Sequence, residues 1–392
     1  KMKNKSLIFI LLLTLFSSLT FSMAHPVTPM LMKSLSLPSF MFGILFAVMA
    51  IGNFIGSPLW GTLSDNKGRI KFLILGALGY GFSQLGFGYV TNPLIILLFR
   101  FTGGFFVVSY LTTSMAYITD ITTKETRVKY ITYYSATSTI GSALGSLLGG
   151  TIGRNNYKIT FIVQFIFCMI LAISVYFLLN ETITPSSEKI YFKKNKSNTN
   201  STFTNKNLMS VFIVIILFFF ASTSYNSTIN YYIEDVLNLS STFIGAFLAI
   251  AGIVGFTVNL FFTPLLTKYF KEINVFKIIT LLLSLTLLLM VYCNNLTIFF
   301  CAAILFASLA SMHIPLQQTL ITKLSNENYG SLMGILNSCK AIGMVAGSLS
   351  AGFIFELGNK LPFFISAIII ATGLIILALS TKKSLSNKIK SY

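Results

Sequence analysis

Two basic residues, Arg100 and Lys340, lie inside stretches of sequence that are otherwise apolar. Asn337 precedes Lys340 by three residues, so the two would share one face of a helix. A basic side chain in the core of a membrane costs at least about 2.5 kcal/mol to insert, so such a residue is interpreted as functional. We predict that Arg100, Lys340 and Asn337 bind a substrate or couple its movement. The alternative is a structural role, with each cation paired to backbone carbonyls or water.

A second set of charged residues lies in a short polar segment between two apolar runs. The segment reads Gly61-Thr-Leu-Ser-Asp65-Asn-Lys-Gly68-Arg69. Gly68 would supply the permissive backbone dihedrals of a very short loop. Asp65 would lie at a helix end within reach of Arg69. The simplest alternative is an exposed loop salt bridge, worth at most about 1 kcal/mol.

The sequence gives no support for enzymatic or metal chemistry. The ten acidic residues lie at the ends of apolar runs or between them, so no carboxylate proton relay is visible inside a membrane. His25 and His313 lie near opposite helix ends and are interpreted as interfacial polar groups. The four cysteines lack CxxC spacing, and no GxxxxGKS/T phosphate loop occurs. We therefore expect no metal, no cofactor and no enzymatic activity.

The composition indicates the kind of molecule that holds these residues. Of 392 residues, 54% are hydrophobic and only 10% are charged, whereas soluble domains carry about 25% charged residues. This composition excludes an ordinary soluble enzyme and indicates an integral membrane protein. The net charge of +18 would suit a nucleic-acid partner. However, the basic residues gather in loops between apolar runs, which favours contact with anionic lipid instead.

Twelve apolar runs are long enough to cross a bilayer, which takes about 20 residues per helix. They lie at about 7–29, 41–64, 70–91, 94–118, 129–153, 158–180, 208–231, 241–265, 272–293, 296–320, 330–355 and 361–380. The first run resembles a signal peptide that ends at Ser22-Met-Ala24, but it continues past that site, so we expect a transmembrane helix. The sequence thus predicts an all-α membrane protein with twelve transmembrane helices in two six-helix bundles, 1–180 and 208–392. A polar cytoplasmic linker, 181–207, would join them.

The distribution of lysine and arginine predicts the orientation in the membrane. If the N-terminus is cytoplasmic, only four of the 28 basic residues lie in outer loops: Lys33, Arg154, Lys158 and Lys360. Basic residues accumulate on the cytoplasmic side of membrane proteins. We therefore predict that both termini are cytoplasmic, in a bacterial plasma membrane. Membrane lipid would be a partner, and nucleic acid would not.

The two halves of the chain repeat one another. The row Gly141-x-x-x-Gly145 recurs 202 residues later as Gly343-x-x-x-Gly347. Two halves of like topology imply two bundles related by an axis along the membrane normal, and alternating access for a small solute. Small residues at this spacing let helix backbones approach closely. We assign this helix-packing role to Gly141, Gly145, Gly149, Gly150, Gly343 and Gly347.

Together these motifs resemble those of the major facilitator superfamily, in the form found in drug:proton antiporters of the tetracycline- and multidrug-efflux type. The segment from Gly61 to Arg69 resembles the signature loop of the superfamily, and the resemblance covers about residues 20–380. Further segments resemble other motifs of these antiporters: His25–Pro29, Pro58–Gly61, Arg100–Gly104, Tyr117–Arg127 and Gly141–Gly150.

The resemblance implies roles for individual residues. A cytoplasmic gate that latches the two halves would be formed by Gly61, Asp65, Gly68, Arg69, Asp120 and Arg127. Arg100 would occupy the fourth-helix position associated with proton coupling. Ser146 stands where the fifth-helix motif usually carries proline, and Ser17 stands near the place of an embedded acid in tetracycline-type exporters. These departures weigh against proton antiport and against cationic drugs.

We predict a secondary active transporter that moves a small organic solute outward by alternating access. By resemblance, it would act as a monomer with the proton as its coupling ion. The alternative is import or export of an anionic metabolite or carboxylate siderophore through a basic central cavity, because no acid would neutralise Arg100 and Lys340. A receptor without flux and a membrane-embedded enzyme are disfavoured, since the sequence shows neither a large soluble domain nor a cluster of acid, histidine or nucleophile.

Overall fold

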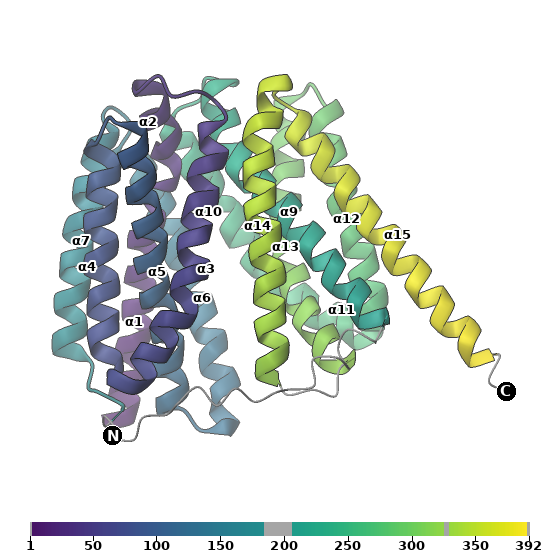
Figure 1. Ribbon diagram of the computed structural model, residues 1–392, viewed down its shortest axis with the longest axis horizontal. Helices are drawn as coiled ribbons and strands as arrows, with labels where there is room; N and C mark the ends of the chain where they lie inside the picture. The colour runs from purple at the N-terminus through teal and green to yellow at the C-terminus, as the bar shows by residue number, and fades with distance from the viewer. Residues whose placement is uncertain (1, 184–205, 325–328, 390–392) are drawn as a thin grey trace. The chain divides into compact units, whose positions relative to one another are not determined.

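The computed structural model describes residues 2–183, 206–324 and 329–389, and these are almost entirely helical (Figure 1). The long helices of the first half are α1 (Met2–Ser22), α3 (Met41–Lys67), α4 (Arg69–Tyr89), α5 (Pro93–Ile121), α6 (Lys124–Ile152) and α7 (Tyr157–Leu178). Those of the second half are α9 (Lys206–Asp235), α10 (Ser241–Thr257), α12 (Glu272–Tyr292), α13 (Leu296–Leu324), α14 (Tyr329–Leu357) and α15 (Leu361–Ile389). The described chain thus contains the twelve long helices that the sequence predicted.

Two of the predicted spans are interrupted helices. After α1, a 3₁₀ turn at His25–Val27 leads into α2 (Thr28–Ser34). Proline lacks an N–H donor, so Pro26 and Pro29 explain this break. In the second half, α10 passes through a π-helical turn at Val258–Phe262 into α11 (Thr263–Tyr269), whose first turn holds Pro264. The predicted spans are therefore present, but these two change axis or pitch inside the apolar run.

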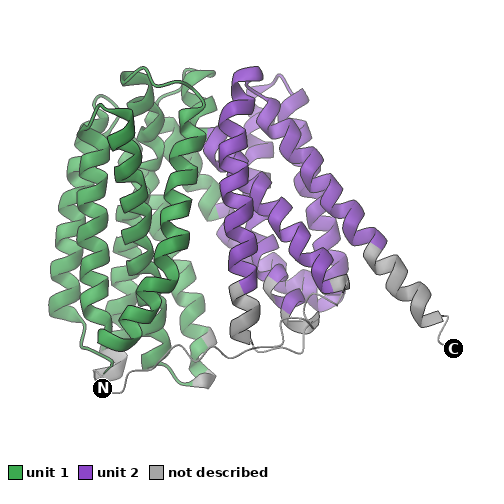
Figure 2. Ribbon diagram, viewed as in Figure 1, with its two compact units in different colours: residues 1–192, 230–253 green, residues 193–229, 254–392 purple. Residues whose placement is uncertain are grey.

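The chain divides into two compact units (Figure 2). Unit 1 comprises residues 1–192 and 230–253, and unit 2 comprises residues 193–229 and 254–392. In unit 1, α5 packs against α3 and α4, and α7 packs against α4. In unit 2, α12 packs against α13 and α15. The bundle boundaries 1–180 and 208–392 stay a prediction.

Eleven segments of the described chain are long and apolar enough to cross a membrane, and α6 is the long helix that falls short. Its sequence contains the polar run Tyr133-Tyr-Ser-Ala-Thr-Ser-Thr139. The last part of α6 packs along α1 through Gly141 and Gly145, where an added Cβ would meet backbone carbonyls of α1, and through Gly149, which faces the carbonyl of Met23 just after α1. Ser138 of α6 also shares a hydrogen bond of 2.8 Å with Ser18. Contact with α1 thus accommodates a helix that is poorly suited to lipid.

The same helix contact recurs in unit 2, as the sequence repeat implies. Gly145 faces the carbonyl of Leu19, and Gly347 of α14 faces the carbonyl of Phe220 on α9. Likewise Gly343 approaches the backbone of Ile216 so closely that a Cβ would collide with its carbonyl oxygen. The first and fifth long helices of each half therefore meet through equivalent glycines.

Candidate functional site

A buried arginine organises the loop between α3 and α4. Arg69, the first residue of α4, is 5% exposed. Its Nε donates to Asp120 Oδ2 at 2.9 Å, and its Nη1 donates to Ser64 Oγ at 2.9 Å. Nη1 also pairs with the carboxylate of Asp65 in the last turn of α3, on the other side of Gly68. The structure thus joins Asp65, Arg69 and Asp120, and we refer to these three residues with Ser64 as the Arg69 cluster.

The Arg69 cluster lies entirely within unit 1, where α3, α4 and α5 converge. Asp120 comes from the last turn of α5, and its Oδ2 also accepts a hydrogen bond of 3.0 Å from the hydroxyl of Thr182. The Asp65 side chain is 61% exposed, whereas that of Asp120 is 24% exposed. A charge-assisted hydrogen bond is stronger where water is excluded. Asp120 is therefore the more important partner of Arg69.

Arg127 contacts the backbone next to Asp120 rather than a carboxylate. Its Nη2 donates to the backbone carbonyl of Thr119 at 3.1 Å, near the end of α5. The last carbonyls of a helix lack intrahelical donors, so a nearby arginine satisfies them well. Within the described part of the chain Arg127 makes no ion pair. Arg127 thus caps the end of α5, and its membership of the cytoplasmic gate stays a prediction.

The sequence-based interpretation missed Glu181, which lies just after α7. Its carboxylate accepts hydrogen bonds from the backbone amides of Arg69 at 2.7 Å and Ile70 at 3.1 Å. These amides are the unpaired donors at the start of α4, where the helix dipole favours a negative charge. Gly68 precedes them with φ of +96°, as predicted for the tight loop. A Cβ on Gly68 would also lie against the Glu181 carboxylate, with Cδ at 2.9 Å.

The glycine at the start of the signature loop has no such constraint. Gly61 lies inside α3, and a Cβ added there would meet no atom within 4 Å. Gly61 is thus close to the Arg69 cluster in sequence, but no contact at this position requires glycine.

Arg100 is buried in unit 1, and no described acidic side chain forms an ion pair with it. It is 3% exposed, and its guanidinium carbon lies 4.6 Å from the ring centroid of Phe87 on α4. Its Nε is buried and has no hydrogen-bond partner. A cation over an aromatic face is stabilised by the ring quadrupole, by about 2 kcal/mol or more when desolvated. Arg100 thus has an unused hydrogen-bond donor inside the protein core.

The two glycines that follow Arg100 differ in their surroundings. Gly104 approaches the backbone of Met49 on α3, where its Cβ would collide with the carbonyl group. Gly103 has only Ser83 Cβ nearby, at 3.6 Å. Close packing of α5 on α3 therefore depends on Gly104 and not on Gly103.

Lys340 is the other basic residue that the sequence placed inside an apolar run, and it lies in unit 2. It is half-buried on α14, and its Nζ lies 5.5 Å from the ring centroid of Phe219 on α9. Asn337 is exposed, one turn earlier on α14. No salt bridge to Lys340 occurs among the described side chains. Lys340 is thus a partly accessible cation that is held against an aromatic ring.

Gly150, another of the predicted glycines, packs α6 against α10 within unit 1. The carbonyl of Gly150 accepts hydrogen bonds from the hydroxyls of Ser241 at 3.0 Å and Thr242 at 3.3 Å. A Cβ on Gly150 would collide with the Ser241 carbonyl and lie 3.3 Å from Gly245 Cα. Gly150 is therefore a contact residue of α6, as Gly141, Gly145 and Gly149 are.

The interpretation of His313 as an interfacial group was wrong. Its side chain is fully buried in unit 2, between rings of α9 and α12. The sequence predicted a span that ends at 320, whereas α13 continues to Leu324 and places His313 farther from its end. His25, by contrast, is half-buried at the turn between α1 and α2.

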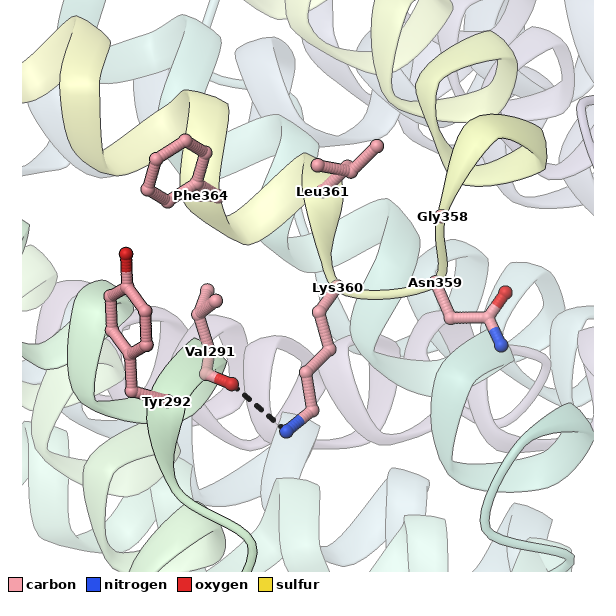
Figure 3. Close-up of a pocket in the computed structure, with 7 residues that line it drawn as sticks. All are labelled: Val291, Tyr292, Gly358, Asn359, Lys360, Leu361 and Phe364. Atoms are coloured by element: carbon pink, nitrogen blue, oxygen red, sulfur yellow. Dashed lines mark hydrogen bonds between the residues drawn. The ribbon is translucent and has the colours of Figure 1, made fainter.

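A surface pocket of about 340 Å³ lies where α12 ends and α15 begins (Figure 3). Lys360 Nζ donates to the carbonyls of Val291 and Cys293, both at 3.0 Å, and so caps the end of α12. The pocket contains none of the predicted site residues. Within the described chain, no group of three or more His, Cys, Asp or Glu side chains could hold a metal ion.

Comparison with known proteins identifies the family. The family description "Major Facilitator Superfamily" matches residues 10–279 and, again, residues 212–391. The two matches begin 202 residues apart, the same interval as the repeat of Gly141 and Gly343. The chain belongs to the major facilitator superfamily. This family consists of membrane transporters rather than enzymes, which confirms that part of the sequence-based prediction.

The relatives of this superfamily member include drug-resistance proteins. It is 25% identical to "Multidrug resistance protein 1" of Bacillus subtilis over 377 residues, which cover 95% of this chain and 96% of the relative. It is 23% identical to "Quinolone resistance protein NorA" of Staphylococcus aureus over 371 residues, with 94% and 95% covered. The chain is thus a superfamily transporter related to multidrug efflux proteins along its full length.

Solved structures support the fold. The nucleoside transporter NupG is similar with a TM-score of 0.81 and 13% identity, over 97% of this chain and 100% of that chain. The human organic anion transporter MFSD10 is similar with a TM-score of 0.68 and 18% identity, over 96% and 99%. These likenesses confirm an all-helical superfamily fold of twelve helices.

Proposed function

We propose that this transporter exports small organic molecules of the multidrug type and draws its energy from proton entry. The observation that carries the proposal is the similarity to "Multidrug resistance protein 1", which extends over 95% of the chain. The assembled Arg69 cluster supports it, because this cluster is built from the signature loop that carries the resemblance. Buried Arg100, with an unpaired Nε, is the candidate coupling residue of unit 1.

In this proposal the Arg69 cluster, together with Gly61, Gly68 and Arg127, stabilises one conformer of the transport cycle. A few kcal/mol suffices to shift a two-state population from one side to the other. Loss of the Arg69–Asp120 pair would change that balance without touching the substrate. We further propose that the transporter acts as a monomer in a bacterial plasma membrane.

A second candidate function is transport of an anionic metabolite. It is favoured by Arg100 and Lys340, since neither cation is neutralised by a carboxylate among the described side chains. A cation in a low-dielectric setting attracts anions and repels organic cations. The carboxylate-siderophore alternative finds no support among the relatives reported above and is set aside.

The proposed orientation places both termini and the linker in the cytoplasm, since most lysines and arginines then lie inside. The linker residue Ser197 lies outside the described residues. A Ser197→Cys variant should react with a membrane-impermeant maleimide only after the cells are permeabilised. Reaction in intact cells would overturn the orientation.

The function is tested with inside-out membrane vesicles that contain the full chain. The probes are a zwitterionic fluoroquinolone, a lipophilic cationic dye and an anionic dye, each supplied outside the vesicles. A pH gradient that is acidic inside the vesicles should drive uptake of at least one probe, and a protonophore should abolish this uptake. Vesicles without the chain serve as the control. Uptake of no probe above that control would overturn the proposed efflux, and uptake of the anionic dye alone would favour the second candidate.

A further inference from the structure

A single imidazole is enclosed in the core of unit 2. His313 lies on α13 with no exposed surface. The ring of Phe218 from α9 stacks on the imidazole, with ring centroids 4.0 Å apart and planes at 22°. The ring of Phe276 from α12 stacks at 4.3 Å and 29°. The imidazole therefore ties three helices together, and its environment decides which charge states it can hold.

Both ring nitrogens have polar neighbours. His313 Nε2 lies 3.2 Å from the hydroxyl oxygen of Thr280, and Nδ1 lies 2.6 Å from Nε2 of Gln317. The Thr280 hydroxyl donates to the carbonyl of Phe276 at 2.7 Å. Its oxygen is then free to accept a hydrogen bond from His313 Nε2, while the Gln317 amide donates a hydrogen bond to Nδ1. This arrangement fits the neutral ring with hydrogen on Nε2.

The Gln317 amide leaves one of its own groups unused. Its Oε1 is buried and has no hydrogen-bond partner. An unsatisfied buried acceptor is costly, and native proteins contain few of them. Half a turn of the amide would bring Oε1 to His313 Nδ1. That contact is favourable only when Nδ1 also carries a hydrogen, as it does in the imidazolium ion.

Burial disfavours the imidazolium ion, and no carboxylate contacts the ring among the described side chains, so the enclosed ring is neutral in this conformer. Stacked aromatic faces attract a cation through their quadrupoles. Among the described side chains, those that stack on the ring or hydrogen-bond to it are Phe218, Phe276, Thr280 and Gln317. None of them titrates, so the proton balance of this site depends on the imidazole alone. We refer to these residues with His313 as the His313 site.

We propose that His313 is a proton-binding site of the transport cycle. The lone pair of Nδ1 takes a proton from water, the Gln317 amide turns so that Oε1 accepts it, and release reverses both steps. This inference rests on the proposed proton-coupled function. Because the ring is sealed in this conformer, proton exchange requires movement of α9, α12 or α13. Proton binding and conformation are then linked, as coupling demands.

The direct test observes the imidazole itself. The chain contains two histidines, so a His25→Gln variant with ¹⁵N-labelled histidine gives NMR signals from His313 alone. In lipid nanodiscs these signals should change from the neutral Nε2–H form to the doubly protonated form between about pH 8 and pH 5. A signal that stays in the neutral form over this range would overturn the proposal.

Variants of Gln317 separate a proton site from a structural one. Gln317→Glu supplies an anionic acceptor and should move the midpoint of the NMR titration to higher pH by about one unit or more. Gln317→Met removes the acceptor and should move it to lower pH. Ser284→Ala, which removes a hydrogen bond of α12 to the Ala367 carbonyl, is the matched control and should leave the midpoint unchanged. Equal midpoints in all four proteins would also overturn the proposal.

A transport arm links the site to coupling. In proteoliposomes with the probe that the wild type moves, His313→Asn should reduce pH-driven accumulation by roughly tenfold or more. It should retain exchange of labelled for unlabelled probe, which needs no net proton movement. Intact pH-driven accumulation in His313→Asn would overturn the proposal. If the wild type moves no probe, the proposed efflux fails, whereas the NMR titration still decides whether His313 binds a proton.

Discussion

The carboxylate of Glu181 accepts a hydrogen bond from the backbone amide of Arg69, 112 residues earlier in the chain. This contact links the residue that follows α7 to the first turn of α4. Glu181 thus binds the backbone of Arg69, whereas Asp65 and Asp120 bind its side chain. The segment at the start of the linker is thus part of the structure around the signature loop.

Replacement of Glu181 should destabilise α4. Glu181→Ala removes the acceptor of two helix-end amides, and the loss of such a cap costs about 1 kcal/mol. Glu181→Gln keeps one acceptor oxygen without the charge and should cost less. Unfolding in detergent, followed by the fluorescence of a thiol-reactive dye, would measure both. Asp235→Asn, which changes an exposed carboxylate at the end of α9, is the control; a loss equal to that of Glu181→Ala would contradict this role.

The two glycines of the signature loop should respond differently to alanine. Gly68→Ala should lower stability by about 1–3 kcal/mol, because its φ of +96° disfavours any side chain. Gly61→Ala should be neutral or slightly stabilising, since its Cβ would meet nothing and alanine favours a helix. Thermal unfolding of the two variants side by side measures the difference. A Gly61→Ala variant as unstable as Gly68→Ala would show that the open space around Gly61 is filled in another conformer.

The two acidic partners of Arg69 should not be equivalent. Asp120→Asn should destabilise the chain by about 1–3 kcal/mol, since Asp120 is the better shielded partner. Asp65→Asn should cost at most about 1 kcal/mol because its carboxylate is mostly exposed. If the Arg69 cluster stabilises one transport conformer, Asp65→Asn should nevertheless slow transport far more than it reduces expression. Normal transport by Asp65→Asn would show that the Asp65–Arg69 pair is only a surface salt bridge.

The adjacent glycines of α5 provide a matched pair of variants. Gly104→Ala would push a methyl group against the Met49 carbonyl group, and overpacking of this kind costs about 1–3 kcal/mol. Gly103→Ala has room, with its nearest neighbour at 3.6 Å. We expect Gly104→Ala to lower the unfolding temperature and Gly103→Ala to leave it unchanged. The reverse order would mean that α3 and α5 separate where this structure has them in contact.

Lys340 should decide the preferred charge of the substrate. Lys340→Gln should weaken transport of an anionic or zwitterionic probe, and Lys340→Arg should retain part of it, because arginine keeps a cation near Phe219. Flux of anionic, neutral and cationic probes should be compared at matched expression. Efficient export of lipophilic cations by Lys340→Gln and the wild type alike would show that Lys340 does not select the substrate.

Most of the fold follows from hydrophobicity, because each crossing of a bilayer needs a long apolar run. The Asp65–Arg69 contact was expected because the two residues flank a very short loop at Gly68. The breaks near Pro26 and Pro264 alter the helix axis inside an apolar run, and hydrophobicity alone does not report them. α6 shows the opposite case: the scan for apolar runs predicted a span at 129–153, although α6 is the least apolar of the long helices and falls short as a span.

The contacts that sequence reasoning missed are those between distant segments. Nothing in the sequence pairs Glu181 with the start of α4, although both were expected at the same membrane surface. The signal that could have suggested this contact is an acid that follows one helix on the same membrane surface where another helix begins, since a helix N-terminus favours a negative charge. His313 was placed too near a helix end because the predicted span stopped at 320. Its burial depends on Phe218 and Phe276, which lie on other helices.

The glycine contacts between α6 and α1 have a consequence for biosynthesis. A nascent segment as polar as α6 partitions poorly into lipid on its own. It can leave the translocon stably only when α1 is beside it, since Gly141, Gly145 and Gly149 then find the backbone that they fit. Because α1 is made before α6, we expect α1 to stay near the exit until α6 has been made. Integration of unit 1 into the membrane is thus a cooperative event, and the order of synthesis differs from the order in which helices become stable.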